Sequence, residues 1–343
     1  MKKEKINIIV ADCEEQELNE FKKALEQNSS LKFKFDCAIS NWQRSGIISE
    51  LKRYFSYFYM GFKLFINRNK YNIIISWQQF DGLFYSFLCN LFKVKKVNKV
   101  YVLNYTYKEK KGLIGKIYKN FMQICMRNNY IDYYHLPGKK AIENTMEQFD
   151  ISKEKFIDIP FGINDLYKKY AQERNPENCK YYLSIGRSNR DYDFLVSAWS
   201  NIKNNLIIIS DTYEITNKKE NIKILNNISG NEQYKYIINC EALIIPIDNP
   251  SIASGDTVLL TAFSFKKKVV VTMPSNLGNT YVKNNINGYL IMKNKIDLEK
   301  TIDKIENDTK NKVGLAARTS FEQKYSRYSM GEKLIKIIIK ESK

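Results

Sequence analysis

The sequence predicts an α/β protein composed of two domains, each built as a doubly wound parallel sheet. Three observations lead to this fold class. The chain has 343 residues, enough for two domains of about 150 residues that each bury a core. Short strand-like runs alternate along it with longer stretches of helical periodicity. The strand-like runs are continuously apolar, which is typical of strands buried on both faces of a sheet.

The strand-like runs fall into two series separated by a polar stretch at residues 164–180. The first series covers residues 6–13, 33–39, 71–77, 99–106, 131–136 and 156–162. The second covers residues 180–186, 205–211, 221–227, 242–248, 268–272 and 287–292. The polar stretch has the composition of a linker. We therefore expect an N-terminal domain at residues 1–164, a C-terminal domain at 165–325, and a C-terminal helix at 326–343 that could pack back on the N-terminal domain.

Composition narrows the classes of function. Hydrophobic residues make up 44% of the chain and aromatics 13%, far from a disordered composition. The net charge of +18 attracts polyanions such as nucleic acids, anionic lipid headgroups or nucleotides, but a genome that favours Lys, Asn and Ile codons gives the same surplus. No nucleic-acid-binding module or basic cluster with interleaved aromatics accompanies the charge, so we expect no nucleic-acid partner.

Cysteine and histidine usage limits the chemistry further. The six cysteines are scattered without a C-x-x-C pair, a pattern that favours reduced thiols in the cytoplasm. With His135 as the only histidine, a histidine-rich metal centre and a Ser-His-Asp triad are both disfavoured, and we expect no metal cofactor. No run approaches the ~18 apolar residues of a membrane span. The sequence predicts a cytoplasmic protein that could touch the inner face of the membrane.

A predicted strand of the second series ends at Gly186 and leads into a loop that carries Arg187 and Arg190. Such a strand end presents free backbone N–H groups at the carboxyl edge of the sheet, where open α/β sheets bind ligands. Two guanidiniums there suit a phosphate or diphosphate. The alternative is a surface loop in which the arginines pair with Asp191 and Asp193.

A second phosphate-binding element is predicted where residues 251–263 open a helix. The free N–H groups and the positive end of that helix would complement the arginines from across the pocket. Ordinary helix capping explains the same residues and is compatible with ligand binding. The candidates at this helix start are Ser254, Gly255, Asp256 and Thr257.

These segments resemble, in order and spacing, the donor domain of GT-B glycosyltransferases, and they are most similar to family 4. The resemblance runs from about residue 159 to residue 292 and rests on five stretches, which are IPFGIND, SIGRSNRDYDFLVSAW, LNNISGNEQYKYIINCEALIIPID, SGDTVLLTAFSFKKKVVVT and NNINGYLI. The first half of the chain is similar mainly in architecture. The resemblance implies two Rossmann-like domains facing each other across a cleft.

The resemblance also implies roles for single residues. Gly186, Arg187 and Arg190 would bind the diphosphate of a nucleotide sugar, and the guanidiniums would stabilise the charge that grows on the leaving diphosphate without a metal. The loop at residues 226–230 resembles the one that lines the base. Its candidates for nucleoside contacts are Asn227, Ser229 and Gly230.

The sequence departs from the family at the ribose site. The two glutamates common in family 4 align with Ala253 and Thr261, and the later one would hold the ribose. Thr261 remains a donor-binding candidate at that position. The usual Gly and Pro before the next strand are replaced by Lys266 and Lys268. A non-catalytic accessory or sugar-nucleotide-binding protein is therefore the alternative to an active enzyme.

If the reaction inverts the anomeric centre, a base must accept the proton of the acceptor hydroxyl. Asp81 follows a predicted strand at the carboxyl edge of the first sheet and is our candidate. Asp12, after the first strand, competes with it. A helix N-cap or a first-turn acid explains either residue without catalysis. His135 also ends a strand, where a structural role is expected.

Residues 51–71 combine apolar and aromatic side chains at helical spacing with flanking cations. The apolar positions are Leu51, Tyr54, Phe55, Phe58, Phe62 and Phe65, and the cations are Lys52, Arg53, Lys63 and Arg68. Such a helix could rest on an anionic membrane surface or bind a lipid-linked glycan, and a core helix would show the same stripe.

Taken together, the sequence predicts a glycosyltransferase with a UDP- or GDP-linked donor. It would extend a glycan or lipid-linked glycan in bacterial-type surface polysaccharide synthesis.

Overall fold

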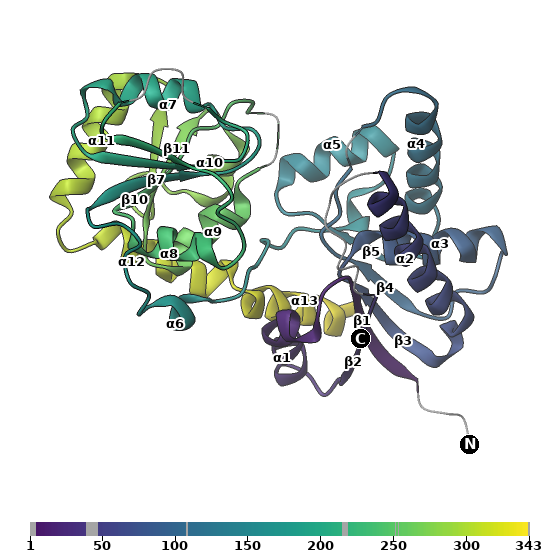
Figure 1. Ribbon diagram of the computed structural model, residues 1–343. Helices are drawn as coiled ribbons and strands as arrows, with labels where there is room; N and C mark the ends of the chain where they lie inside the picture. The colour runs from purple at the N-terminus through teal and green to yellow at the C-terminus, as the bar shows by residue number, and fades with distance from the viewer. Residues whose placement is uncertain are drawn as a thin grey trace. The chain divides into compact units, whose positions relative to one another are not determined.

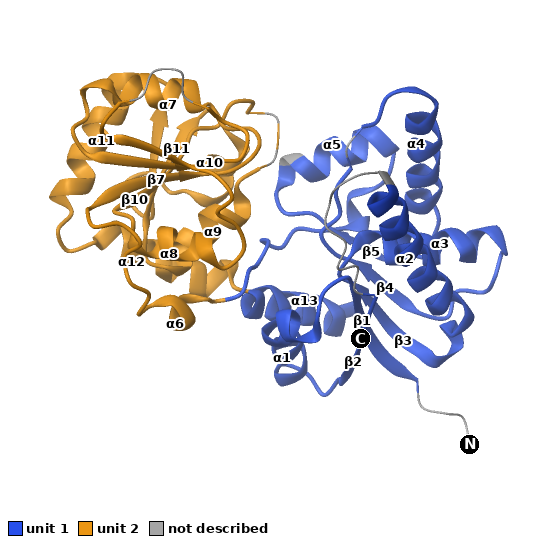
Figure 2. Cartoon of the chain, viewed as in Figure 1, with its two compact units in different colours: residues 1–164, 327–343 blue, residues 165–326 orange. Residues whose placement is uncertain are grey.

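The chain forms two compact units in the computed structural model (Figure 1; Figure 2). The structure describes residues 5–38, 47–107, 109–214, 219–250, 252 and 254–341, without the side chains of Ile47 and Lys140. Residues 1–164 and 327–343 make the first unit, and residues 165–326 make the second. Each unit contains one six-stranded sheet whose paired strands run parallel, with helices on both faces. The predicted fold class of two doubly wound parallel sheets is confirmed.

The sheet of the first unit has the strand order β2-β1-β3-β4-β5-β6. Its strands are β1 (Ile6–Ala11), β2 (Phe33–Cys37), β3 (Tyr71–Ser76), β4 (Lys99–Val102), β5 (Tyr133–His135) and β6 (Phe156–Ile157). Its α-helices are α1 (Asn19–Gln27), α2 (Ile47–Ile66), α3 (Gln79–Leu91), α4 (Gly112–Arg127), α5 (Lys139–Phe149) and α13 (Arg327–Glu341). Every predicted run of the first series contains one of these strands.

Alternate strand residues supply the two faces of this sheet, since successive side chains of a strand point to opposite sides. Ile8 and Val10 belong to a core cluster with side chains of α2, α3 and α4. Ile9 belongs to a second cluster with side chains of α1 and α13. In Figure 1 the C-terminal helix α13 lies beside α1. The last helix of the chain thus completes the core of the first unit.

The sheet of the second unit has the strand order β12-β11-β10-β7-β8-β9. Its strands are β7 (Tyr181–Ile185), β8 (Asn205–Ile209), β9 (Ile222–Leu225), β10 (Ala242–Ile245), β11 (Lys268–Met273) and β12 (Tyr289–Met292). Its α-helices are α6 (Tyr167–Tyr170), α7 (Tyr192–Ala198), α8 (Glu232–Asn239), α9 (Asp256–Ser264), α10 (Asn276–Tyr281), α11 (Lys295–Asn307) and α12 (Lys312–Ser320). Five runs of the second series each contain one strand, and β11 extends one residue beyond its predicted run at 268–272.

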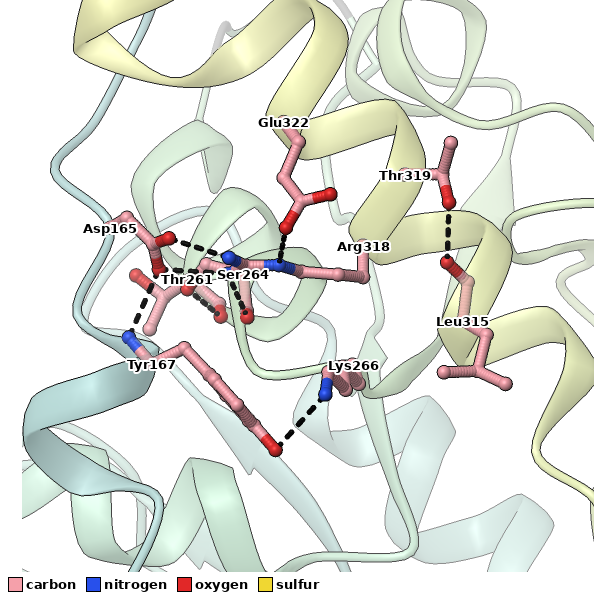
Figure 3. Close-up of polar contacts among 9 residues, drawn as sticks. All are labelled: Asp165, Tyr167, Thr261, Ser264, Lys266, Leu315, Arg318, Thr319 and Glu322. Atoms are coloured by element: carbon pink, nitrogen blue, oxygen red, sulfur yellow. Dashed lines mark hydrogen bonds and ion pairs between the residues drawn. The ribbon is translucent and has the colours of Figure 1, made fainter.

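The polar stretch predicted as a linker is anchored to the second unit at its start (Figure 3). Asp165 forms a bidentate ion pair with Arg318, whose Nη1 and Nη2 lie 2.7 and 2.6 Å from the two carboxylate oxygens. The same guanidinium donates to the Ser264 carbonyl at the end of α9. Lys266 donates from Nζ to the hydroxyl of Tyr167. These contacts fix the first residues of the stretch on α9 and α12.

Candidate functional site

The loops after β7 and β10 meet where the strand order of the second sheet reverses. β7 has β8 on one side and β10 on the other, and open α/β sheets bind ligands outside the carboxyl ends of the strands at such a point. Arg190 forms an antiparallel bridge with Ile247, and the Asp191 N–H donates to the Pro246 carbonyl at 2.8 Å. The predicted arginine loop is therefore joined by its backbone to the loop that leads toward α9.

Asn189 adds side-chain hydrogen bonds between these two loops, and it was not predicted as a site residue from the sequence. Its Nδ2 donates to Ser254 Oγ at 2.9 Å and to the Asn249 carbonyl at 3.1 Å. Its Oδ1 accepts from the Asn249 N–H at 2.7 Å. The residue has a φ of +56°, a left-handed conformation that asparagine tolerates better than most residues. An asparagine two positions after the first arginine of a glycine-arginine loop was the available signal.

The guanidinium of Arg190 lies between two glycines. A Cβ atom on Gly186 would lie 2.9 Å from Arg190 Nε, and one on Gly255 would lie 3.1 Å from Nη2. Both glycines also have positive φ values, +152° and +95°, which side chains other than hydrogen disfavour. Nη1 donates to the carbonyls of Ser188 and Asn189 at 3.3 and 3.2 Å. The side chain is thus fixed from several directions.

Arg190 has no ion-pair partner within 4.0 Å among the residues that the structure describes. The Asp256 carboxylate influences it only from a longer distance. Burial lowers the pKa of its guanidinium, which nevertheless stays charged because arginine does not deprotonate in proteins. A half-buried cation held by carbonyls and glycines is suited to receive an anion from the ligand.

Arg187 has different surroundings. Its side chain is 69% exposed, and its Nε pairs with Oδ2 of Asp211 at 3.1 Å. The other carboxylate oxygen of Asp211 accepts from the Asn227 N–H at 2.7 Å. Asp211, two residues after the end of β8, therefore connects the arginine loop to the loop at residues 226–230. Asp211 was not predicted as a site residue, although it is the acid that ends the predicted strand-like run at 205–211.

The carboxylates that the sequence offered as partners for the arginines have other roles. Asp191 caps α7 by accepting from the Phe194 N–H at 2.9 Å, and its other oxygen pairs with Lys293 at 2.7 Å. Asp193 accepts from the Tyr213 hydroxyl at 3.0 Å. The interpretation in which the arginines pair with these two acids is wrong for the chain as folded.

A cavity of about 240 Å³ lies at the carboxyl ends of β7 and β8. Four predicted candidates line it, namely Gly186, Arg187, Ser229 and Gly230. Its apolar wall is made by Ile185, Ile209, Ile228 and Val258. Ser210, Asp211 and Gln233 add polar groups. An apolar pocket with a few convergent polar groups is the usual form of a small-molecule site, and this one opens beside the arginine loop.

The helix-start candidates occupy a different part of the site. α9 begins at Asp256 with Gly255 as its N-cap, so the predicted helix start is confirmed and its cap is a glycine with no side chain to contribute. Ser254 accepts from Asn189, and Thr257 is exposed. Asp256 lies near the buried Tyr281 hydroxyl, and burial together with that charge raises the pKa of Tyr281. Asn227 is exposed and lies outside the cavity lining.

Thr261 does not reach the site. Its side chain is buried, and its hydroxyl donates to the Thr257 carbonyl within α9 at 2.7 Å. The helix itself satisfies this hydroxyl, so the structure gives Thr261 no access to a donor. Ala253, the position of the other missing glutamate, lies outside the described residues.

In the first unit, Asp12 and Asp81 follow β1 and β3, the strands at which the order of that sheet reverses. Asp81 is 1% exposed, and neither of its carboxylate oxygens has a hydrogen-bond partner in the described structure. Burial, together with the charges of Asp12 and Asp36, raises its pKa well above the usual range. Asp12 is half-buried and accepts from the Tyr57 hydroxyl at 3.0 Å. Of the two, Asp12 is the more accessible to an acceptor.

His135 is a buried structural residue. Its Nε2 lies 2.8 Å from the Ile159 carbonyl, and its Nδ1 accepts from the Asn104 N–H at 3.2 Å. This pairing fits a neutral ring with its hydrogen on Nε2. Burial lowers the pKa of the ring to about 4. The expected structural role agrees with this environment.

The helix predicted within residues 51–71 is α2, which ends at Ile66 and has apolar side chains on two faces. Tyr57, Met60 and Leu64 are buried in the core. Leu51 and Phe55, from the predicted stripe, are 64% and 71% exposed. Core packing therefore accounts for Tyr57, Met60 and Leu64 but not for the exposed Leu51 and Phe55. Neither α2 nor another helix of the described segments combines the length and hydropathy needed to cross a bilayer.

Comparison with known proteins gives the fold a context. No protein-family model and no curated protein matches the chain. Among solved structures, a glycosyltransferase from Rickettsia africae ESF-5 superposes with a TM-score of 0.65 at 16% identity, over 97% of both chains. WaaG, a glycosyltransferase involved in lipopolysaccharide biosynthesis, gives 0.59 at 11% identity, over 97% of this chain and 99% of its own.

Anabaena HepE, solved in complex with UDP, gives a TM-score of 0.61 at 11% identity, over 98% of this chain and 100% of its own. These likenesses extend over nearly the whole chain and include both units. They confirm that the chain has the two-domain, Rossmann-like GT-B fold that the sequence resemblance implied.

Proposed function

We propose that the chain is a glycosyltransferase that uses a nucleotide sugar and binds the nucleoside diphosphate in its second unit. The observation that carries this proposal is the guanidinium of Arg190, fixed between Gly186 and Gly255 without an ion-pair partner among the described residues. It lies at the reversal of strand order, and the loop that holds it also borders the cavity of about 240 Å³. The UDP bound to HepE, a protein with the same fold, supports a nucleotide as the ligand.

The proposed chemistry is electrostatic. When the glycosidic bond to the diphosphate breaks, negative charge grows on the departing phosphate oxygens. Arg190 would meet that charge from a fixed position, and the free N–H groups at the start of α9 would add to it. We propose that these groups act without a metal ion. Addition of EDTA should then leave the turnover number unchanged.

The donor base and the acceptor are finer parts of the proposal. We propose a UDP- or GDP-linked donor and a glycan or lipid-linked glycan acceptor in bacterial-type surface polysaccharide synthesis. Asp12, with Asp81 as the alternative, would serve as the base in an inverting reaction. Exposed apolar residues on α4, which include Leu113, Ile114 and Ile117, add to those on α2 and support a peripheral position on an anionic membrane.

Release of nucleoside diphosphate from a panel of UDP- and GDP-sugars tests the proposal, with and without lipid-linked and soluble glycan acceptors. We expect one donor to be turned over by the wild type and the rate to fall at least tenfold in Arg190→Ala, since a hydrogen bond to a charged group is worth about 1.5–3 kcal/mol. Arg174→Ala is the matched control, because Arg174 is an exposed arginine of the same unit that does not line the cavity.

The second candidate is a non-catalytic protein that binds sugar nucleotides. It is favoured by Thr261, which leaves the family's ribose position without a carboxylate. Tight binding of a sugar nucleotide with no diphosphate release under any acceptor would support it over the enzyme. Failure of every nucleotide to bind would contradict both candidates.

A further inference from the structure

The cavity in the second unit lacks the usual carboxylate for a ribose but contains another. Thr261, at the family position, is buried and bonded within its own helix. Of the described residues that line the cavity, Asp211 is the one carboxylate. It lies two residues after the end of β8, the strand next to β7, which leads into Gly186. In dinucleotide-binding sheets, an acid downstream of the glycine loop accepts hydrogen bonds from ribose hydroxyls.

The carboxylate of Asp211 is oriented but not fully used. Its Oδ1 accepts from the Asn227 N–H at 2.7 Å, which fixes the plane of the group. Within the described part of the chain, its Oδ2 is contacted only by the Nε of Arg187, at 3.1 Å. A carboxylate offers about four acceptor positions, so a diol can bind at Oδ2 while the backbone contact persists. The Asp211 side chain is 33% exposed and accessible from the cavity.

Arg187 is the movable partner of this ion pair. Its side chain is mostly exposed, and among the described residues its guanidinium donates to no carbonyl, in contrast to that of Arg190. Exposed ion pairs contribute little to stability, so little is lost when such a pair opens. Both residues line the cavity. A nucleoside diphosphate offers the ribose diol to the Asp211 carboxylate and a phosphate to the Arg187 guanidinium.

We propose that Asp211 is the ribose-binding residue of this protein and that the nucleoside diphosphate opens the Arg187–Asp211 ion pair. Asp211 then accepts from the ribose hydroxyls, and Arg187 turns to the diphosphate that Arg190 already faces. In the structure the ion pair holds the two recognition groups and keeps each from standing unpaired. This inference rests on the proposed function, because it requires a nucleotide in the cavity.

Isothermal titration of the full chain tests the inference, with UDP and GDP, their 2′-deoxy and 3′-deoxy forms, and uridine and guanosine as ligands. For the base that binds, we expect the wild type to prefer the ribonucleotide over at least one deoxy form by about tenfold or more, the worth of a hydrogen bond to a charged group. Asp211→Asn should bring this ratio close to one while the affinity for the deoxy form changes less than threefold.

Arg187→Ala should affect the nucleoside diphosphate and the bare nucleoside differently. It should weaken binding of the nucleoside diphosphate, yet leave binding of the bare nucleoside unchanged or tighter, because Asp211 no longer has a competing partner. Asp193→Asn is the matched control, since Asp193 is an exposed acid in the first turn of α7 that accepts from the Tyr213 hydroxyl instead. Asp211→Ser keeps an acceptor for the Asn227 N–H and replaces Asp211→Asn if that variant fails to fold.

The outcomes separate the inference from the proposed function. A wild type that binds UDP or GDP but shows no ribose preference, or a preference that survives in Asp211→Asn, overturns the role of Asp211 and leaves the proposed function intact. Unchanged or tighter nucleoside binding in Arg187→Ala supports the ion-pair exchange, and weaker binding contradicts it. Absence of binding to every nucleotide overturns both proposals.

Discussion

Arg187 and Arg190 differ in how much conformational freedom their side chains would lose when a ligand binds. Arg190 is already held by the carbonyls of Ser188 and Asn189 and by two glycines. Arg187 is exposed and held by one carboxylate. Ordering a free arginine side chain on binding costs up to about 2 kcal/mol of conformational entropy, which a pre-fixed side chain has already lost on folding. Arg190 should therefore contribute more to diphosphate affinity.

The first prediction compares these arginines by nucleotide affinity. Arg190→Ala should weaken UDP or GDP binding by about 1.5–3 kcal/mol, the worth of a hydrogen bond to a charged group, and Arg187→Ala should weaken it less. Titration calorimetry measures both, with Arg174→Ala as the control for general loss of charge. Gly255→Ala should behave like Arg190→Ala, since its Cβ would lie 3.1 Å from Arg190 Nη2. Equal losses at the two arginines would contradict the argument.

A second prediction concerns Asp81 and the pH dependence of stability. Because burial raises the pKa of Asp81 in the folded state, the folded protein holds a proton that the unfolded chain releases above about pH 3.8. The stability associated with this proton is present at low pH and is lost as pH rises toward the folded-state pKa. Asp81→Asn removes the titration, so it should stabilise the protein at pH 8 more than at pH 4.5.

Thermal unfolding of wild type and Asp81→Asn from pH 4.5 to 8 measures this difference, at about 1.36 kcal/mol for each unit of pKa shift. The same variant tests catalysis. If turnover stays unchanged while stability rises, Asp81 is a structural acid, and Asp12→Asn becomes the variant for the catalytic base. A destabilised Asp81→Asn at pH 8 would count against a protonated buried carboxyl.

At the scale of elements, α2 and α4 carry apolar residues that the core does not use. α2 exposes residues at positions typical of one helix face, and the exposed set includes Ile48, Leu51, Phe55, Phe62 and Ile66. Rings of Phe58, Phe84 and Phe121 connect α2, α3 and α4 in sequence. In Figure 1 these three helices lie together in the first unit. Lys116 and Lys119 are exposed on α4.

The third prediction is that these helices bind anionic membranes. Apolar side chains would enter the interface, and each nearby cation would add about 1 kcal/mol at an anionic surface. Co-sedimentation with phosphatidylglycerol vesicles should be strong at 0.1 M salt and weak at 1 M, as the Debye length falls from about 10 to about 3 Å. Lys116→Glu with Lys119→Glu should reduce binding, as should Leu51→Ser with Phe55→Ser.

The matched control for charge is Lys300→Glu with Lys304→Glu, two exposed lysines on α11 of the second unit. That variant should bind vesicles like the wild type. Lys63 is a poorer choice for charge reversal, because it pairs with Asp36 at 2.6 Å and its loss would disturb the first sheet. If the wild type does not bind the vesicles at low salt, the prediction is wrong, and membrane binding does not account for the exposed apolar faces of α2 and α4.

Across the whole molecule, the sequence was most informative where a pattern reports burial directly. All twelve strands fall within or across the predicted runs, because strands buried on both faces are continuously apolar, as in the run that contains Ile73, Ile74 and Ile75. The Gly186 loop and the start of α9 were visible for a similar reason, since glycines and small residues mark strand ends and helix starts locally.

The contacts that assemble the site are of another kind. Asn189 bonds to Asn249 and Ser254, and Asp211 bonds to Asn227, over separations that no local pattern encodes. Which of two arginines is fixed depends on Gly255, far along the chain. The role of α13 is likewise invisible locally, since its apolar stripe predicts burial but not the partner against which it is buried.

The fourth prediction follows from this placement of α13, which completes the first unit from the far end of the chain. Leu334, Ile335 and Ile338 are fully buried in the core cluster that also contains Phe21 of α1. Gly331 lets the two helices approach closely, since a Cβ there would lie 2.6 Å from the Phe21 carbonyl oxygen. Truncation after Ser326 removes this packing and should unfold the first unit, because burial of one such side chain contributes about 1.5–3 kcal/mol and a whole domain is stable by only about 5–15.

The second unit has its own core, built from residues between Tyr182 and Val313, so it should survive the truncation and keep its nucleotide affinity within about threefold, a difference below 1 kcal/mol. Calorimetric unfolding should therefore lose one transition and retain the one that UDP or GDP shifts upward. Ile335→Ala should lower the free energy of unfolding of the first unit by about 2–5 kcal/mol, which is typical when truncation of a buried side chain leaves a cavity. Lys336→Ala, next to it on the exposed side of α13, should not. Loss of nucleotide binding in the truncated chain would mean that the first unit takes part in holding the nucleotide, and would refute the independence of the second.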